Sequence, residues 1–372
     1  RLSRLGRAWP KASAISSWTL PSMASIHTGV LPSVHGADGR PGGHYQGLSN
    51  DVETLAETLS TVGYRTNAVV TNPWLESSMG FARGFDSYTH ATESMPHRFI
   101  FAGMADGPSP IDAEAVVSRA LEVLETSSGP GTFLWVHLLD PHMPYMHAHG
   151  GAGDGLADGQ LRSGKLTTAT MRQEIRDAYN AEVAHMDAQI MRLLDALEER
   201  AFFQEGTLIF VSDHGEEFWD HGGTEHGHSH HTEVVDVAMT ISGPINSHSG
   251  SGVVSHVDIA PTLLKAAGIE RVGIDLRDGA PDDRIALTYG NNYYRIDKSA
   301  RDASGRVIVY GEPHQGEKAH FFDHLSDPLE LSPLPASSDN GLYGAALSLE
   351  APEEAEAAAI NRAALEALGY IQ

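Results

Sequence analysis

Cysteine is absent from the chain, and basic residues are scarce. Without cysteine the protein has no disulfide framework, no thiolate zinc site and no cysteine nucleophile. The 25 Lys and Arg residues face 49 Asp and Glu, a formal net charge of −24, so we expect no nucleic-acid partner. Long apolar runs are also missing. Phe133–Leu139 is far shorter than a membrane span and contains a histidine, so we expect no transmembrane helix in this chain.

The 372 residues are 41% hydrophobic and 20% charged, which is enough apolar material for a large core. Apolar runs of strand length alternate with amphipathic segments of helical length. For example, Thr132–Leu139 has the composition of a buried strand, and Thr168–Glu199 has apolar residues at helical spacing. This alternation predicts an α/β fold, with a mostly parallel sheet sandwiched by helices.

The two ends of the chain differ from this central pattern. After about Pro281, short alternating runs predict a small antiparallel sheet, and Pro352–Leu368 has the composition of an acidic helix. We therefore expect a large domain over residues 1–283 and a small C-terminal antiparallel α+β subdomain over residues 284–372. At the other end, Arg1–Trp9 resembles the last turns of a basic helix, which suggests a fragment or a processed product.

Hydroxyl side chains are concentrated in Ser16–Ser22, between a predicted strand and a predicted helix over Pro21–Thr28. A hydroxyl at the start of a helix faces the positive end of the helix dipole, which favours bound phosphate and a developing oxyanion. The alternative is that Thr19 or Ser22 only caps the helix.

A second polar cluster, Ser212–Glu216, directly follows a predicted strand. The carboxylate of Asp213 beside the imidazole of His214 is a plausible half-site for a divalent metal. Further histidines follow at His221, His226, His228, His230 and His231. We expect the adjacent pair His230 and His231 to lie in a solvated loop.

The third cluster, His137–Tyr145, ends another predicted strand. Pro141 and Pro144 restrict the turn and are expected to hold His142 outward, although a structural role for this histidine is equally compatible with the pattern. His137 lies within the strand and is expected to face the core.

Taken in order, these motifs resemble the sulfatase-like branch of the alkaline phosphatase superfamily. The resemblance spans nearly the whole chain and is carried by Thr19–Ser22, Thr28–Gly29, His35–Gly36, Asp140–Pro144, Ser212–Glu216, Val254–Leu264 and Leu368–Ile371. Each motif is short, but their common order makes the signal specific. The resemblance implies the α/β fold of that superfamily.

The resemblance also implies roles for individual residues. Thr19 falls at the position of the family's nucleophile, and Asp213 and His214 fall on two metal ligands, with the Thr19 oxygen as a further ligand. The implied cofactor is a divalent metal, with zinc or manganese favoured and calcium possible. The family's first strand, which carries one or two more acidic ligands, is expected to precede Arg1.

Four other residues match substrate-contacting positions. His142 corresponds to the histidine that contacts the transferred group or the leaving oxygen, and Asp140 belongs to the same motif. His226 corresponds to a later substrate-contacting or second-metal histidine, with His228 as the alternative. The implied substrate is a small-molecule, lipid or glycan ester, and the family favours a periplasmic, extracellular or membrane-tethered location.

Three departures from the sulfatase pattern bear on the substrate. Sulfatases carry Cys or Ser at the Thr19 position for oxidation to formylglycine, which threonine cannot form. Met23 and Val30 stand where the family has cations. These departures predict hydrolysis of phosphate mono- and diesters, as in a phosphodiesterase, through a phosphothreonine intermediate. The alternatives are a sulfuric ester hydrolase, a phosphoethanolamine- or phosphoglycerol-type transferase, and a non-catalytic binding relative.

Overall fold

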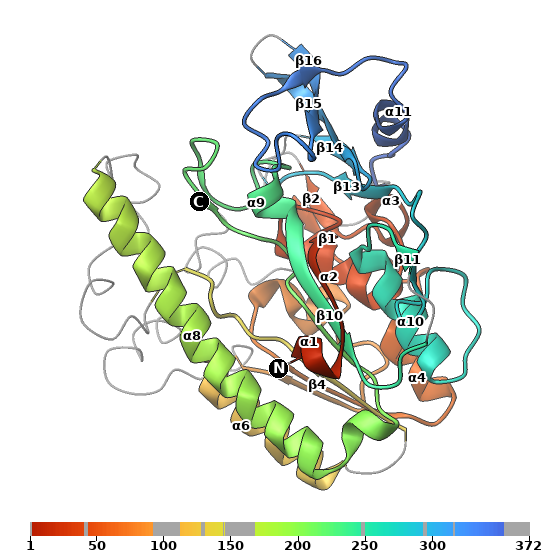
Figure 1. Ribbon diagram of the computed structural model, residues 1–372. Coiled ribbons are helices and arrows are strands. Elements are labelled where there is room, and N and C mark those ends of the chain that lie inside the picture. The colour runs from red at the N-terminus through yellow and green to blue at the C-terminus, as the bar shows by residue number, and fades with distance from the viewer. Residues whose placement is uncertain are drawn as a thin grey trace. The chain divides into compact units, whose positions relative to one another are not determined.

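The computed structural model describes residues 2–40, 44–91, 112–127, 131–143, 145, 168–246, 250–292, 296–314 and 317–352 (Figure 1). The chain divides into two compact units. The first is built from Arg1–Leu55 and Ala201–Ala358, and the second from Ala56–Arg200 and Ala359–Gln372. The boundary expected at residue 283 falls inside the first unit and stays a prediction.

A three-stranded sheet in the order β1-β10-β7 lies in the first unit (Figure 1). Its strands are β1 (Gly6–Ser13), β10 (Asp236–Ser242) and β7 (Leu208–Val211), and β10 is antiparallel to both neighbours. At Gly6 the main chains are so close that a Cβ atom would lie 1.8 Å from the Ile241 carbonyl oxygen.

The first strand corrects one expectation. Helical structure at the start of the chain is confined to α1 (Leu2–Leu5), and the rest of the segment expected to be helical, up to Trp9, belongs to β1. The reason is long-range pairing. From Gly6 onward the backbone is paired with β10, more than 200 residues away, and this pairing overrides the local helical pattern.

One helix of the first unit matches its predicted segment. α2 (Thr19–Thr28) begins two residues before the expected Pro21 and ends at Gly29, whose φ of 73° suits glycine. The Val254–Leu264 motif contains a short 3₁₀ turn, η5 (His256–Asp258), that continues into α10 (Ile259–Ala266).

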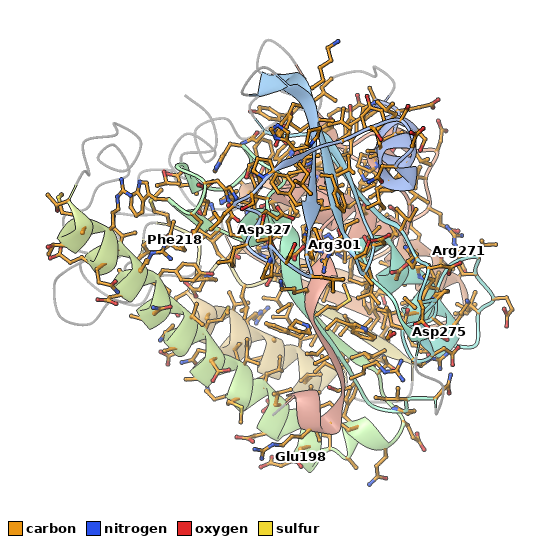
Figure 2. All side chains as sticks on the ribbon, turned by 45° about the horizontal axis from the view of Figure 1, so that its top comes forward. Glu198, Phe218, Arg271, Asp275, Arg301 and Asp327 are labelled. Atoms are coloured by element: carbon orange, nitrogen blue, oxygen red, sulfur yellow. The ribbon has the colours of Figure 1, made fainter. Side chains whose placement is uncertain are left out.

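The expected C-terminal antiparallel sheet is present and has five strands in the order β13-β14-β15-β16-β17. Its core is formed by Ala300 and Val307 of the sheet with Leu342 and Ala346 of α11. Arg301 of β14 is buried among the packed side chains of this unit (Figure 2). The bounds are β13 (Ala286–Tyr289), β14 (Lys298–Arg301), β15 (Gly305–His314), β16 (Glu317–Asp323), β17 (Leu334–Pro335) and α11 (Gly341–Leu347).

The second unit contains a parallel sheet in the order β5-β4-β6 with two helices, α6 and α8, that pack together. Val69 of β4 packs against Val116, Ala120 and Val123 of α6. The strand predicted at Thr132–Leu139 is shorter, and its residues are half-buried rather than buried. The bounds are β4 (Arg65–Val70), β5 (Ser87–His90), β6 (Thr132–Val136), α6 (Ala113–Thr126) and α8 (Ala169–Glu199).

The remaining elements are short. They are α3 (Pro32–His35), β2 (Asp38–Arg40), β3 (His44–Gln46), α4 (Leu55–Thr61), η1 (Pro73–Leu75), η2 (Ser77–Met79), η4 (Phe202–Gln204), β8 (Glu217–Phe218), β9 (Thr224–Glu225), α9 (Thr232–Val235), β11 (Gly250–Ser251) and β12 (Gly279–Ala280). Of the helices in the described part of the chain, none combines the length and the apolar composition that a bilayer crossing requires. The helix expected at Pro352–Leu368 and the motif Leu368–Ile371 lie outside the described residues, which end at residue 352.

Candidate active site

Thr19 opens α2, and its side chain is almost fully buried. Trp18, the N-cap residue, has an extended backbone and forms no side-chain cap. The Thr19 hydroxyl lies 3.2 Å from His214 Nε2, and the Ser22 hydroxyl donates to the Ser16 carbonyl at 3.1 Å. Both hydroxyls are therefore engaged elsewhere than in capping, and Thr19 sits at the positive end of a ten-residue helix.

Asp213 and His214 follow the end of β7. The main-chain N–H of His214 donates to Asp213 Oδ1 at 3.0 Å. In the His214 ring, Nδ1 lies 2.9 Å from the Gly215 carbonyl oxygen. A carbonyl only accepts, so Nδ1 carries the proton and Nε2 presents its lone pair toward Thr19. Glycine is required at position 215, because a Cβ atom there would lie 2.1 Å from the Glu233 carbonyl oxygen.

Three polar atoms thus meet beside α2. His214 Nε2 lies 3.2 Å from Thr19 Oγ1 and 3.4 Å from Asp213 Oδ2. This mixture of imidazole nitrogen and oxygen donors suits zinc or manganese, and its oxygens also suit calcium. Within the described ranges, no group of three or more His, Asp or Glu side chains is arranged to hold an ion. The three atoms therefore fit one part of a metal site.

His226 stacks on His214, with ring centroids 4.0 Å apart and 29° between the ring planes. Its Nδ1 lies 3.2 Å from Glu216 Oε2. Because a carboxylate accepts, Nδ1 is the donor, and Glu216 selects the tautomer of His226. No role is predicted for Glu216 from the sequence, although it stands two positions after the candidate ligand His214, and metal-site histidines are often oriented by carboxylates.

His228 belongs to a second histidine–carboxylate pair. Its Nε2 lies 2.6 Å from Glu217 Oε2, and Glu217 Oε1 accepts main-chain N–H groups of His221 and Gly223 at 2.9 and 2.6 Å. Burial alone would raise the pKa of Glu217, but His228 and these two N–H groups bring it below its ordinary value. Burial alone would lower the pKa of His228, and Glu217 raises it. His226 and His228 are thus each paired with a carboxylate, and which of them contacts the substrate stays a prediction.

One main-chain carbonyl, that of Gly290 after β13, lies within hydrogen-bond distance of three side chains. Ser16 Oγ and Ser17 Oγ donate to it at 3.3 and 3.4 Å, and His230 Nε2 lies 3.1 Å away. The first two residues directly precede the start of α2, and His230 belongs to the histidine-rich segment. The C-terminal sheet therefore links the two parts of the chain that form the site.

His230 and His231 correct another expectation, because both are buried rather than solvated, at 1% and 8% exposure. His230 lies against the Gly290 carbonyl, and His231 Nδ1 lies 3.1 Å from Glu330 Oε2. These partners are 60 and 99 residues away in sequence, so the local sequence pattern does not predict them.

His256 belongs to a family motif but has no predicted role, and it contacts the two segments that lead into the site. Its Nδ1 accepts the Ile15 N–H at 3.3 Å, so its Nε2 donates to the Ser212 carbonyl at 3.0 Å. The side chain is fully buried, and burial lowers the pKa of His256 to about 4. The neutral ring thus connects the segments that lead into Thr19 and Asp213.

The third predicted cluster lies in the second unit. Asp140 Oδ2 accepts the Ala113 N–H at 2.7 Å, at the first residue of α6. His142 Nδ1 lies against the Met143 carbonyl, so that nitrogen is the donor. His137 is buried with Thr71, as expected for a residue that faces the core.

Of the predicted site residues, the structure therefore brings together Thr19, Asp213, His214 and His226 in the first unit, while His228 follows β9 and bonds Glu217 of β8. Asp140 and His142 belong to the second unit. Their roles in substrate binding stay predictions.

The chain is similar to proteins of one known family. Residues 11–269 match the sequence profile of the family described as Sulfatase. Over 158 residues the chain is 31% identical to the low-salt glycan biosynthesis sulfotransferase Agl7 of Haloferax volcanii, a match that covers 40% of this chain and 37% of that protein. The chain thus spans little more than a third of the length of this relative.

Two solved structures show the same fold at 17% identity. One is a protein in complex with its substrate D-glucosamine-2-N,6-O-disulfate, with a TM-score of 0.72 over 90% of this chain and 87% of that chain. The other is the phosphonate monoester hydrolase of Agrobacterium radiobacter, with a TM-score of 0.65 over 92% and 86% of the two chains. The expected fold class is therefore confirmed, with β10 as an antiparallel strand among the described strands.

Proposed function

The chain belongs to the sulfatase family, and from that premise we propose that it is a metal-dependent ester hydrolase that cleaves phosphate mono- and diesters through a phosphothreonine at Thr19. The observation that carries this proposal is the position of the Thr19 hydroxyl. It lies at the uncapped start of α2 and 3.2 Å from His214 Nε2. A hydroxyl that is buried next to an imidazole lone pair and a carboxylate has the surroundings of an activated nucleophile.

Each residue of the site has a step in this reaction. Asp213 and His214 would hold a divalent ion, which would supply Lewis-acid chemistry by lowering the pKa of the Thr19 hydroxyl and polarising the ester. Thr19 Oγ1, once deprotonated, attacks phosphorus while the bond to the leaving oxygen breaks, and the positive end of α2 stabilises the charge on the phosphoryl oxygens. The Thr19 proton passes to solvent. His226, protonated on both ring nitrogens, gives its Nε2 proton to the leaving oxygen, and water then attacks phosphorus, which releases phosphate and restores the Thr19 hydroxyl.

Three side chains, those of Thr19, Met23 and Val30, support phosphate rather than sulfate as the transferred group. Threonine does not yield the formylglycine that sulfatases use, and it is already a nucleophile for phosphorus. Met23 is buried in α2 and Val30 is half-buried after it, at the two positions where the family pattern has cations. Without these cations, a sulfate group gains fewer charge-assisted hydrogen bonds.

A second candidate is hydrolysis of sulfuric esters. It is favoured by the solved neighbour whose substrate is a sulfated glucosamine. Transfer to an acceptor alcohol instead of water is a variant of the first candidate, and the name of the Haloferax relative includes a transferase activity. Both alternatives use the same site, so the substrate and the acceptor distinguish them.

The test compares 4-nitrophenyl phosphate, bis(4-nitrophenyl) phosphate and 4-nitrophenyl sulfate at one fixed metal concentration. Thr19→Ala should lower turnover of the phosphate esters by about a thousandfold or more, as for other covalent nucleophiles, whereas Thr19→Ser should keep much of it. Ser22→Ala is the matched control, because it removes a hydroxyl from the same helix that donates to Ser16 rather than to the site.

Rapid acid quenching of the wild-type reaction should give a peptide that carries phosphate on Thr19. Full activity of Thr19→Ala would exclude this residue as the nucleophile. Faster cleavage of the sulfate ester would replace the first candidate by the second.

A further inference from the structure

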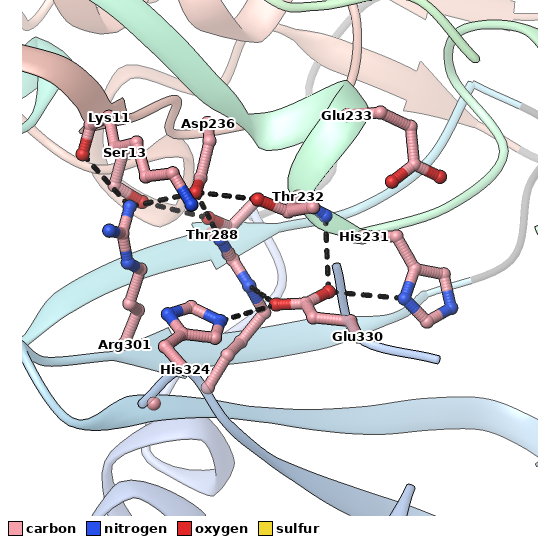
Figure 3. Close-up of polar contacts among 12 residues, drawn as sticks. Lys11, Ser13, His231, Thr232, Glu233, Asp236, Thr288, Arg301, His324 and Glu330 are labelled. Carbon is pink, nitrogen blue, oxygen red and sulfur yellow. Dashed lines mark hydrogen bonds and ion pairs between the residues drawn. The ribbon is translucent and has the colours of Figure 1, made fainter. Parts of the chain in front are cut away.

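Glu330 lies after β16, far in sequence from the site, yet its carboxylate is completely buried (Figure 3). Oε1 accepts from Arg306 Nε at 2.8 Å and from His324 Nε2 at 2.7 Å. Oε2 accepts from His231 Nδ1 and from the Thr232 N–H, both at 3.1 Å. All four acceptor positions of this carboxylate are therefore used.

Glu330 contacts both ends of residues 221–231, which we call the histidine loop. At its start, His221 Nε2 donates to the main-chain carbonyl of Glu330 at 2.9 Å. At its end, His231 bonds the Glu330 side chain, and the His221 and His231 rings stack with centroids 3.6 Å apart and 6° between planes. One residue of the C-terminal sheet region thus joins both ends of the histidine loop.

The loop closed in this way carries the proposed proton donor. His226 and His228 lie between the two ends, and the His226 ring stacks on His214. In general, a displacement of about 1 Å at the base of such a loop is enough to misplace a reacting group and to reduce its rate contribution by up to about a hundredfold. The closure at Glu330 is therefore in the right place to control the position of His226.

The backbone conformation of Glu330 indicates that a glutamate is needed at this position. Its φ is 56°, in the left-handed region that a glutamate seldom occupies. Such a conformation persists where the surrounding contacts determine it, here the bonds to both its carbonyl and its carboxylate. A turn that only reversed the chain would be served better by glycine.

Charge compensation keeps the carboxylate ionised. Arg306 is fully buried and also pairs with Asp236, which in turn pairs with Arg301. Burial alone would raise the pKa of Glu330, but Arg306, His231 and His324 hold it well below its ordinary range. The carboxylate is therefore a permanent acceptor for the histidine loop at neutral pH.

We infer that Glu330 is a positioning residue that closes the histidine loop at its base and thereby aligns His226 for proton transfer to the leaving oxygen. The inference rests on the proposed function, because it requires that His226 gives a proton to the leaving group. It predicts a loss that depends on the leaving group, since a leaving group of low pKa departs without that proton and one of high pKa does not.

Two variants test the inference, each on a 4-nitrophenyl and a benzyl phosphate ester. Glu330→Gln is nearly isosteric, but its NH₂ group faces two donors whichever way the amide is turned, either Arg306 and His324 or His231 and Thr232. His231→Phe keeps a ring on His221, removes the bond to Glu330, and leaves the pair with Arg306 intact.

Both variants should lower kcat for the benzyl ester by about tenfold or more while changing KM little, and should lower kcat for the 4-nitrophenyl ester by less than about threefold. Arg301→Met is the matched control. It disturbs the same ion cluster, but Arg301 donates to the Lys11 carbonyl and to Asp236 rather than to Glu330, so the variant should change kcat for both esters by the same small factor.

The His226→Ala variant in the same assay separates the proposed proton-donor role of His226 from the positioning role of Glu330. If His226→Ala shows the selective loss while folded Glu330→Gln and His231→Phe proteins do not, the positioning inference is overturned and the proposed function stands. If His226→Ala shows no selective loss, the proton-donor role and the inference both fall. Equal losses on the two esters in the Glu330 and His231 variants would indicate a purely structural role and would also overturn the inference.

Discussion

Replacing His256 by leucine should destabilise the protein strongly. The side chain is fully buried, and it satisfies the Ile15 N–H and the Ser212 carbonyl, at 3.3 and 3.0 Å. Leucine has a similar volume and neither donates nor accepts, so two main-chain groups lose their partners without a large cavity. At roughly 1–3 kcal/mol for each orphaned group, the free energy of unfolding should fall by about 2–6 kcal/mol.

The same variant should change the response to acid. Burial lowers the pKa of His256 to about 4 in the folded protein, against 6.5 as its ordinary value. Between these values the unfolded chain binds a proton that the folded protein excludes, so stability falls as the pH decreases from 6.5 to 4, by up to roughly 3 kcal/mol. The leucine variant lacks this loss, and the difference between the two proteins should shrink over that interval. Burial lowers the pKa of His35 to about 3, but that effect is common to both proteins.

Urea denaturation followed by tryptophan fluorescence at several pH values measures both effects. The control is His320→Leu, which replaces another buried histidine that packs edge-on against the Tyr310 and Phe322 rings and reports the general effect of this substitution. A loss below about 1 kcal/mol at pH 7 for His256→Leu, or a difference that stays constant down to pH 4, would refute the reasoning.

Three other perturbations have defined outcomes. Chelation of divalent metal should abolish turnover, and zinc or manganese should restore it better than calcium because His214 contributes nitrogen beside Asp213; activity that survives chelation would remove the metal from the proposal. Asp140→Ala should lower the unfolding free energy by about 1 kcal/mol, because Ala113 N–H at the start of α6 loses its acceptor; an unchanged melting temperature would contradict this. Burial lowers the pKa of His221, but its carboxylate and carbonyl partners raise it to about 9. Protonated His221 should therefore stabilise the folded protein fully below pH 6.5, and this stabilisation should be lost as the pH rises through 9. A difference in unfolding free energy between wild type and His221→Phe that is independent of pH would disprove this prediction.

The parts of the site that could be predicted are those in which local sequence carries the chemistry. Thr19 precedes a helix and Asp213–His214 follows a strand, and both patterns are visible in a few residues. Their order along the chain resembles a known family, which supplied the expectation that they meet. The 3.2 Å separation of Thr19 and His214 agrees with that expectation.

The parts that could not be predicted depend on pairing across long sequence separations. Trp9 lies in a strand because β10 binds it, although its neighbours resemble a helix. His231 is buried because Glu330, 99 residues later, accepts its proton. Glu330 itself stands among turn residues with no periodicity, so only its three-dimensional surroundings reveal its contacts.

The Gly290 carbonyl, which three side chains share as an acceptor, has a consequence for how the sequence of this protein can vary. The acceptor of the three bonds from Ser16, Ser17 and His230 is a main-chain oxygen, which no amino-acid substitution removes. The φ of Gly290 is 73°, so the residue itself is constrained, and the Asn291 side chain that follows it donates to the His228 carbonyl at 3.2 Å. Natural divergence or laboratory recombination is thus constrained at these two positions, whereas the carbonyl acceptor itself is inherited with the path of the backbone.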